Sequence, residues 1–193
     1  MKHRSRLSLL VILCLVAGGC VLPSLHPLYT DKDLIFDTHL VGIWRPEDTK
    51  EIWAFTRQGD KEYRFVHTDD TGKRLQMTAR LLEIKRVKFL DFSPIEDEEY
   101  APNTGPLLRA HVFLLVLQTQ PTLRVSFLND EWLDEYLKEN PRALKHERIK
   151  DADGTGDQIV LTAAPGRLQR FLLAHRRTPG AFNEPISLTR RKE

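Results

Sequence analysis

Cysteine is scarce in this sequence. Its 193 residues contain only two cysteines, Cys14 and Cys20, and both lie among the first twenty. The rest of the chain holds none, so a disulfide within that part is excluded, and so is a zinc site built on cysteine.

Long apolar runs are also lacking. The longest, "LSLLVILCLVA", covers about eleven residues, whereas a helix needs about twenty to cross a bilayer. It follows a short basic start and precedes Gly18-Gly19. A basic start, a short apolar middle and small residues before a cleavage point are the three parts of a secretory signal peptide.

Neither sign of charge dominates. The chain has 29 Lys and Arg against 27 Asp and Glu, for a formal net charge of +2. Three of the positive charges, on Lys2, Arg4 and Arg6, belong to the predicted signal segment, so the remainder is close to neutral. Such a balance lacks the positive excess typical of nucleic-acid-binding proteins, and no nucleic-acid partner is predicted.

The sequence contains no familiar catalytic or metal-binding motif. The histidines beyond the signal segment form no His-x-His or His-x-x-x-His pair. A Gly-x-Ser-x-Gly elbow and a phosphate loop are missing too. The stretch "DADGTGD" has Ile149 and Val160 where a calcium loop needs oxygen ligands, so it indicates a hairpin turn. The sequence therefore predicts a protein that is not an enzyme, with no catalytic residue, metal or cofactor.

The residues before Cys20 carry a resemblance to a known class. Val16-Ala17-Gly18-Gly19-Cys20 resembles the lipobox of bacterial lipoproteins. The resemblance implies cleavage after Gly19, a diacylglycerol on the Cys20 sulfur and attachment to a membrane of the cell envelope. Two or more acyl chains anchor stably, because each buried methylene contributes about 0.8 kcal/mol. Residue 21 is valine and not the aspartate that marks inner-membrane retention in enteric bacteria, so the expected location is the outer membrane.

Three parts make up the predicted domain organisation: a signal peptide over 1–19, a tether over 20–30 and one β-rich domain over 31–193. The tether is expected because residues 21–30 contain Pro23 and Pro27 and show no hydrophobic period. The remaining length suffices for one domain with its own core.

From Val41 onward, short runs of alternating polarity are separated by turn residues, which is typical of an antiparallel sandwich or barrel. The run 109–120 is almost wholly apolar, which predicts a central strand. The end of the chain differs. There we expect two helices, a hairpin between them and a last strand, at 129–141, 165–177, 145–163 and 184–191.

Gly42-Ile43-Trp44 resembles the Gly-x-Trp motif that begins the first strand of lipocalin-like barrels. In that family the Trp plugs the closed end of the barrel and a late-strand Arg packs over it. The resemblance assigns these roles to Trp44 and to Arg190 or Arg191, while the family's Thr-Asp-aromatic motif has no counterpart here. The predicted fold class is mainly β (α+β), an antiparallel meander forming a lipocalin-like barrel or half-barrel with two C-terminal helices.

Two functions remain open at this stage. The first is a non-catalytic binding module for an apolar ligand inside the sheet. The residues expected to face that ligand are Trp53, Phe55, Tyr63 and Phe65, with Phe89, Phe92 and Phe113 on later strands. The alternative is a structural or assembly lipoprotein that meets another envelope protein through a face bearing Trp132 and Tyr136. The same aromatics also suit a solid core, so a cavity beneath Trp44 would distinguish these readings.

Overall fold

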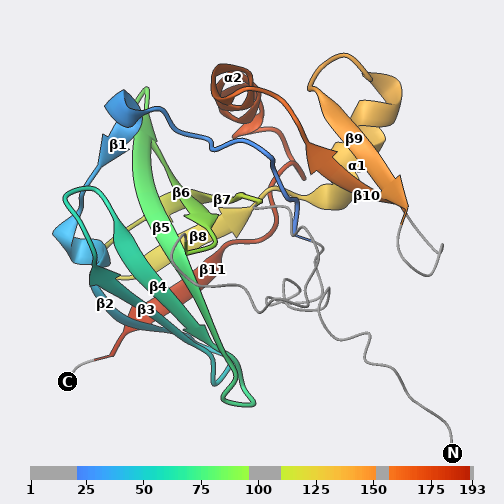
Figure 1. Cartoon of the computed structure of the whole chain (residues 1–193). Helices are drawn as coiled ribbons and strands as arrows, with labels where there is room; N and C mark the ends of the chain where they lie inside the picture. Colours follow the sequence, from blue (N-terminus) through green and yellow to red (C-terminus); the bar gives the residue numbers. More distant parts are fainter. Residues whose placement is uncertain (1–20, 96–109, 151–156, 192–193) are drawn as a thin grey trace, which may run out of the picture.

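A computed structural model describes residues 21–95, 110–150 and 157–191. These residues form a closed antiparallel barrel of eight strands with two helices beside it (Figure 1). Going round the barrel, each strand pairs with the next and the last returns to the first. In this order the strands are β2 (Gly42–Pro46), β3 (Ile52–Arg57), β4 (Tyr63–Thr68), β5 (Arg74–Ile84), β6 (Val87–Ser93), β7 (Val112–Gln118), β8 (Leu123–Phe127) and β11 (Ile186–Arg190). The predicted mainly β fold is confirmed, and the barrel is complete rather than half-formed.

Buried and exposed residues alternate along the early strands, and the buried ones line the barrel interior. Trp53 and Phe55 of β3 are buried, and the residues between and after them are more exposed. On β4, Tyr63, Phe65 and His67 are buried in the same alternating way. Because successive side chains of a strand point to opposite faces, one face of each strand lines the interior and the other meets solvent.

Strands β6 and β7 are buried on both faces. On β6, Leu90 and Phe92 belong to the interior core, whereas Phe89 packs in a second core outside the barrel wall. On β7, Leu114 faces inward and Phe113 outward in the same manner. Burial on both faces explains why residues 112–116 are continuously apolar. The expectation that Phe89 and Phe113 face the barrel interior is wrong, because both pack in the second core.

The segment between β8 and β11 builds the second core. It contains α1 (Asp130–Glu139), β9 (His146–Lys150), β10 (Asp157–Leu161) and α2 (Pro165–His175). Asn129 caps α1 by accepting a hydrogen bond from the Trp132 N–H at 3.0 Å, and Pro165 occupies the start of α2. Strands β9 and β10 form the expected hairpin, while its turn at 151–156 lies outside the described residues.

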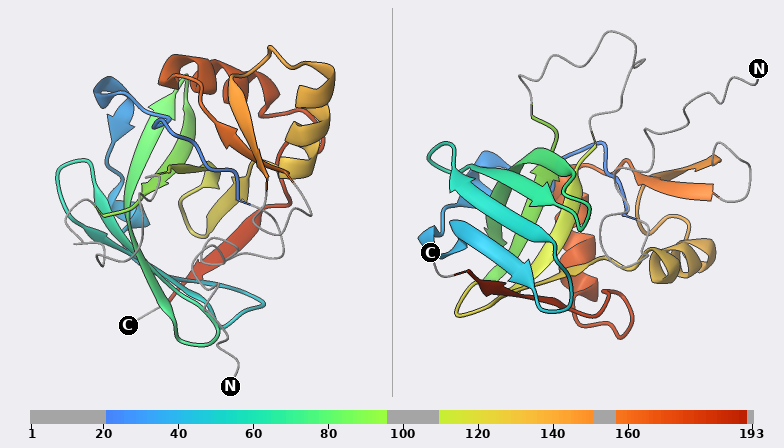
Figure 2. Two further views of the ribbon diagram at one scale, coloured as in Figure 1. Left: turned by 45° about the vertical axis from the view of Figure 1, so that its right-hand side comes forward. Right: turned by 90° about the horizontal axis from the view of Figure 1, so that it is seen from below.

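The helices cover the outer wall of the barrel. Leu133 of α1 and Leu168 of α2 pack with Phe89, Phe113 and their neighbours on the outward face of the strands. Figure 2 shows α1 and the β9–β10 hairpin beside the barrel. The sheet has no free edge for the helices to cover, because β11 closes it by pairing with β2 and β8.

Residues 21–30 pack against the domain, contrary to the expectation of a loose tether. Leu28 is fully buried, and its backbone N–H donates a hydrogen bond to Asp91 at 2.8 Å. Ser24 is also fully buried, and its backbone N–H donates to the His111 carbonyl oxygen at 2.9 Å. The prolines and the absent period concealed this packing, because the contacts are made to strands far away in the sequence. The segment then leads through the 3-10 turn η2 (Asp31–Asp33), the short strand β1 (Leu34–Ile35) beside β5 and the turn η3 (Thr38–Leu40) into β2.

Candidate functional site

One end of the barrel is closed around Trp44. Its ring is buried, and its Nε1–H donates a hydrogen bond to the Leu40 carbonyl oxygen at 2.9 Å. The Arg190 guanidinium lies 5.6 Å from the centre of the Trp44 ring and donates to the Val41 carbonyl oxygen. Of the two arginines considered from the sequence, Arg190 takes this position. The buried Trp44 ring is therefore held by the η3 turn and by the last strand.

Asp37 ties several parts of this closed end together. Its carboxylate accepts hydrogen bonds from the His39 N–H at 3.0 Å and from Lys88 Nζ at 3.1 Å. Burial opposes ionisation, but these hydrogen bonds outweigh it and lower the pKa of Asp37 to about 2. The Tyr63 hydroxyl accepts from the Asp37 N–H at 2.7 Å, and burial raises the pKa of Tyr63 to about 12. Tyr63 is thus a structural residue of the closed end.

An apolar cavity of about 60 Å³ lies toward the other end of the barrel interior. On β4, His67 lines this cavity and lies about 13 Å along the strand from Tyr63. The lining consists of Val21, Trp53, Phe65, His67, Leu75, Met77, Phe92, Val112, Leu114 and Phe127. A water needs about 10–15 Å³ and benzene occupies a cavity of about 150 Å³. The enclosed space is therefore too small for a whole lipid and accommodates only one end of an amphiphile.

The four residues predicted to face a ligand divide into two pairs. Trp53 and Phe65 line the cavity, whereas Phe55 and Tyr63 are fully buried in the packed part of the core. Trp44 is not among the residues that line the cavity. Sequence reasoning missed His67 as a site residue, although it shares a face with Phe65 on the same strand.

Two polar atoms in the cavity wall have no hydrogen-bond partner among the described residues: Trp53 Nε1 and His67 Nδ1. The other ring nitrogen of His67, Nε2, lies 3.2 Å from the Glu51 carboxylate. An ionised carboxylate only accepts hydrogen bonds, so Nε2 carries the hydrogen, and Nδ1 is an acceptor whenever the ring is neutral. Both atoms are buried and belong to residues that line the cavity, and buried polar groups normally have partners.

A buried Asp–His pair holds the N-terminal segment beside this cavity. Asp91 is 1% exposed, and its second carboxylate oxygen lies 2.6 Å from His111 Nδ1. Burial raises the pKa of Asp91, although the hydrogen bonds from His111 and from the Leu28 N–H act in the opposite direction. Val21, a few residues before this attachment point, is part of the cavity lining.

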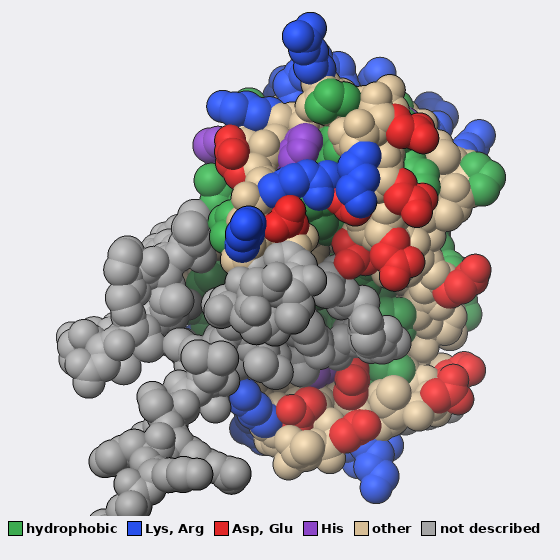
Figure 3. All heavy atoms as spheres, turned by 90° about the vertical axis from the view of Figure 1, so that its right-hand side faces the viewer, with side chains coloured by type: hydrophobic (Ala, Val, Ile, Leu, Met, Phe, Trp, Pro, Cys, Tyr) green, Lys and Arg blue, Asp and Glu red, His purple; other side chains and the backbone are tan. Residues whose placement is uncertain are grey.

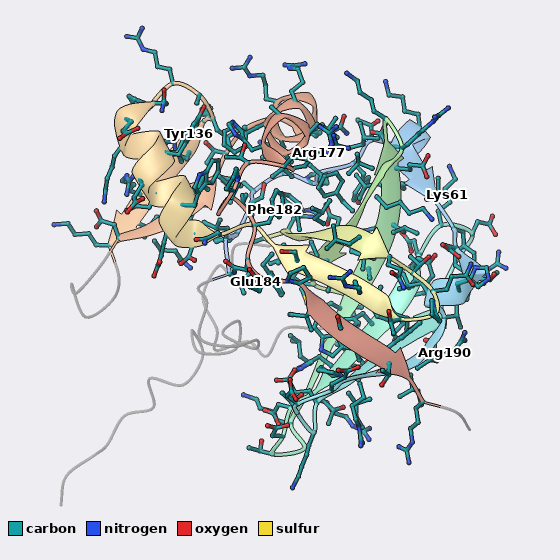
Figure 4. The ribbon with its side chains drawn as sticks, turned by 180° about the vertical axis from the view of Figure 1, so that it is seen from behind. Lys61, Tyr136, Arg177, Phe182, Glu184 and Arg190 are labelled. Carbon is teal, nitrogen blue, oxygen red and sulfur yellow. The ribbon has the colours of Figure 1, made fainter. Side chains whose placement is uncertain are left out.

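A second aromatic cluster lies between the two helices. Trp132 and Tyr136 of α1 stack at 5.0 Å between ring centres, and His175 of α2 lies 4.6 Å from Phe171 and 4.8 Å from Tyr136. Trp132, Tyr136 and His175 are partly exposed. Burial lowers the pKa of His175. Figure 4 shows Tyr136 on α1, on the side of the molecule away from Arg190.

The residues that the structure describes were searched for metal-binding clusters and for membrane-spanning helices. Among them, no three His, Cys, Asp or Glu residues are grouped closely enough to hold a metal ion. Within the same residues, no helix is long and apolar enough to span a bilayer. A scan against protein-family models, a search of curated proteins and a search of solved structures found no match.

Proposed function

We propose that this protein is a lipid-anchored protein of the bacterial cell envelope, in the outer membrane, and that it acts as a non-catalytic binding module. Its ligand is an apolar molecule with one hydroxyl or carboxyl group. The observation that carries this proposal is the apolar cavity with its two unpartnered nitrogens, on Trp53 and His67.

The chemistry of the cavity wall supports this class of ligand. Nine of the lining residues are apolar, so a short hydrocarbon segment can be buried against them without breaking a hydrogen bond. A hydroxyl group can both accept a hydrogen bond and donate one, which matches the Trp53 N–H and the His67 Nδ1 acceptor. Because each buried unsatisfied group costs about 1–3 kcal/mol, a ligand that satisfies them gains affinity and orientation.

The position of the cavity supports a connection with the membrane. Val21 lines it, and the residue immediately before it is Cys20, which the lipobox resemblance makes the lipidated residue. Consecutive Cα atoms are about 3.8 Å apart. A lipid on Cys20 therefore places the membrane close to the cavity, and the ligand is an amphiphile drawn from it.

Native mass spectrometry and ligand titration test the proposal. We expect the purified chain to retain or take up a fatty acid or fatty alcohol, with an affinity that falls in Trp53→Phe because the ring remains and the N–H donor is lost. The matched control is Trp132→Phe on α1, which leaves the cavity unchanged. A protein that shows no bound amphiphile and no thermal shift with fatty acids or fatty alcohols would refute it.

The second candidate function is assembly with another envelope protein. The observation that favours it is the partly exposed aromatic cluster of Trp132, Tyr136 and His175 between the helices. Aromatic residues are enriched at protein interfaces. A photo-crosslinking residue at position 136 should capture one specific partner in cells, whereas the same residue at Glu139, exposed on the same helix, should not.

A further inference from the structure

Two adjoining hollows lie between α2 and the end of the β5–β6 hairpin. Their volumes are about 630 and 650 Å³, and they share Val87 of β6 and Arg176 just after α2. We call them together the basic groove, because its lining includes the cations Lys32, Lys85, Arg86, Lys88, Arg170, Arg176 and Arg177. Figure 3 shows Lys and Arg side chains at the top of the molecule, which is the end where α2 and the tip of the β5–β6 hairpin lie in Figure 1.

Acidic residues do not compensate this charge within the groove. Neither hollow has an Asp or Glu among its described lining residues. Lys88 is paired with Asp37 at 3.1 Å, and Arg176 donates to the Leu173 carbonyl oxygen. The other five cations form no ion pair with the described residues. Asp33 interacts electrostatically with Lys32, so the groove holds more cations than counter-charges, and this excess creates a local positive potential on a chain that is otherwise nearly neutral.

The hairpin tip presents two of these cations at a conformational cost. Lys85 and Arg86 connect β5 to β6 and have φ angles of 50° and 66°. Both values lie in the left-handed region, and two-residue turns of this kind strongly prefer Asn-Gly. Lys and Arg are strained in this conformation, and the strain suggests that the two charges serve a function.

The groove is also lined by apolar side chains. Leu117 of β7 is 49% exposed, which is the largest exposure among the described large hydrophobic residues. It lies in the same hollow as Val87 and Leu115, and Leu173 of α2 lines the adjoining one. A lining that combines cations with apolar side chains matches a molecule that is itself divided into an anionic head and an apolar chain.

We propose that the basic groove binds an anionic amphiphile, with a phosphate group held by Lys85, Arg86 and the arginines after α2, and its chain along Leu117. Arg177 lies beside α2 at this end of the molecule (Figure 4). The groove is separate from the barrel cavity. On β5, Leu75 lines the cavity, whereas Lys85 follows the far end of the strand, up to about 33 Å away. The inference therefore does not depend on the function proposed for the cavity.

Vesicle flotation tests the proposal on the chain that begins at residue 20 with Cys20→Ser, so that no acyl chain of its own contributes. We expect binding to phosphatidylglycerol vesicles, little binding to phosphatidylcholine vesicles and a loss of binding at high salt. In the soluble arm, dodecyl phosphate should bind and inorganic phosphate should bind much more weakly. Comparable affinity for both would overturn the amphiphile and leave a simple phosphate site.

The decisive variant is Lys85→Asn with Arg86→Gly. It removes two charges while supplying the residues that this turn prefers, so binding should fall by about tenfold or more while thermal stability is kept or raised. The control pair is Arg64→Gln with Arg124→Gln, two exposed arginines on β4 and β8 that do not line the groove. Equal loss in both pairs would overturn the proposal, and so would binding to an acidic peptide but to neither lipid form.

Discussion

Gly42 is constrained twice by its surroundings. Its φ angle of +145° lies in a region that side-chain-bearing residues rarely adopt, and a Cβ added there would lie 2.9 Å from the Arg190 side chain. The same guanidinium packs over Trp44, two residues further along the strand. The Arg190 side chain passes over Gly42 to reach the Trp44 ring, so its contact with Trp44 requires that residue 42 has no side chain.

Replacement of Gly42 by Ala should destabilise the protein by about 1–3 kcal/mol, from backbone strain and displacement of Arg190. The measurement is chemical denaturation. Gly59→Ala is the matched control, because its Cβ would find its nearest neighbours at 3.8 Å in ordinary contact. Similar losses in the two variants would contradict the role given to Gly42.

Among the elements, the N-terminal segment 21–30 is attached to the domain by backbone hydrogen bonds to His111 and Leu161 and by a hydrogen bond to the buried Asp91. One carboxylate oxygen accepts from the Leu28 N–H and the other lies 2.6 Å from His111. The segment shapes the candidate site, since Val21 belongs to the cavity lining. Binding at the cavity therefore depends on an attachment made by residues that lie outside it.

Asp91→Ala should cost about 3–5 kcal/mol, because it leaves the buried Leu28 N–H and the partly buried His111 without their partner. Hydrogen exchange at Leu28 should accelerate, and proteases should cut within 21–30. Asp91→Asn should cost less, since an amide oxygen still accepts one of the two bonds. Asp60→Ala, on an exposed carboxylate, is the control. Unchanged exchange at Leu28 in Asp91→Ala would count against this attachment.

The packing of α1 on α2 should weaken in mild acid because of His175. Burial among aromatic rings lowers the pKa of His175 below its ordinary value of 6.5. The unfolded chain therefore takes up the proton first as the pH falls. The contribution of this residue to stability is complete above about pH 6.5 and decreases as the pH falls through 6.5 toward the lower folded-state pKa.

His175→Phe should lose less stability than the unmodified chain as the pH falls, because Phe cannot take up a proton. Thermal melts between neutral pH and about pH 5 would measure this difference. His26→Gln is the control, since His26 is exposed and outside the cluster. If His175→Phe and the unmodified chain lose stability in parallel over this range, His175 does not cause the loss.

At the scale of the whole molecule, the barrel and the inserted helices form two cores that share strands β5 to β7. The interior core is filled by aromatics except for the small cavity, and the outer core joins α1, α2, β10 and residues 22–28 to the barrel wall. The proposed anchor and cavity lie toward one end, and the basic groove lies at the other. The two proposals therefore place a membrane anchor at one end of the molecule and a second amphiphile at the other.

Cys20→Ser should abolish lipidation, because Cys20 is the only cysteine after the signal segment and the lipobox resemblance places the lipid on its sulfur. Metabolic labelling with a radioactive fatty acid measures the result directly. The unmodified chain should carry label and float with the membrane fraction, whereas the variant should not. Equal labelling of both chains would remove the anchor from the proposed function.

Local signals in the sequence determined much of the fold. Alternation placed Trp53, Phe55, Tyr63 and Phe65 on buried faces, and the cap at Asn129 marked the start of α1. Gly42-Ile43-Trp44 indicated the plugged end. These features follow from the period of a strand, the free N–H groups of a helix and the conformational freedom of glycine, which are properties of neighbouring residues.

Only the tertiary structure decided which buried residues meet a cavity and which fill the core. Trp53 and Phe65 reach the cavity while Phe55 and Tyr63 do not, although all four follow the same alternation. The attachment of residues 21–30 likewise depends on a hydrogen bond between Leu28 and Asp91, 63 positions apart. The physical reason is that burial on a face is set by the strand period, whereas empty space and distant contacts are set by how the whole chain closes on itself.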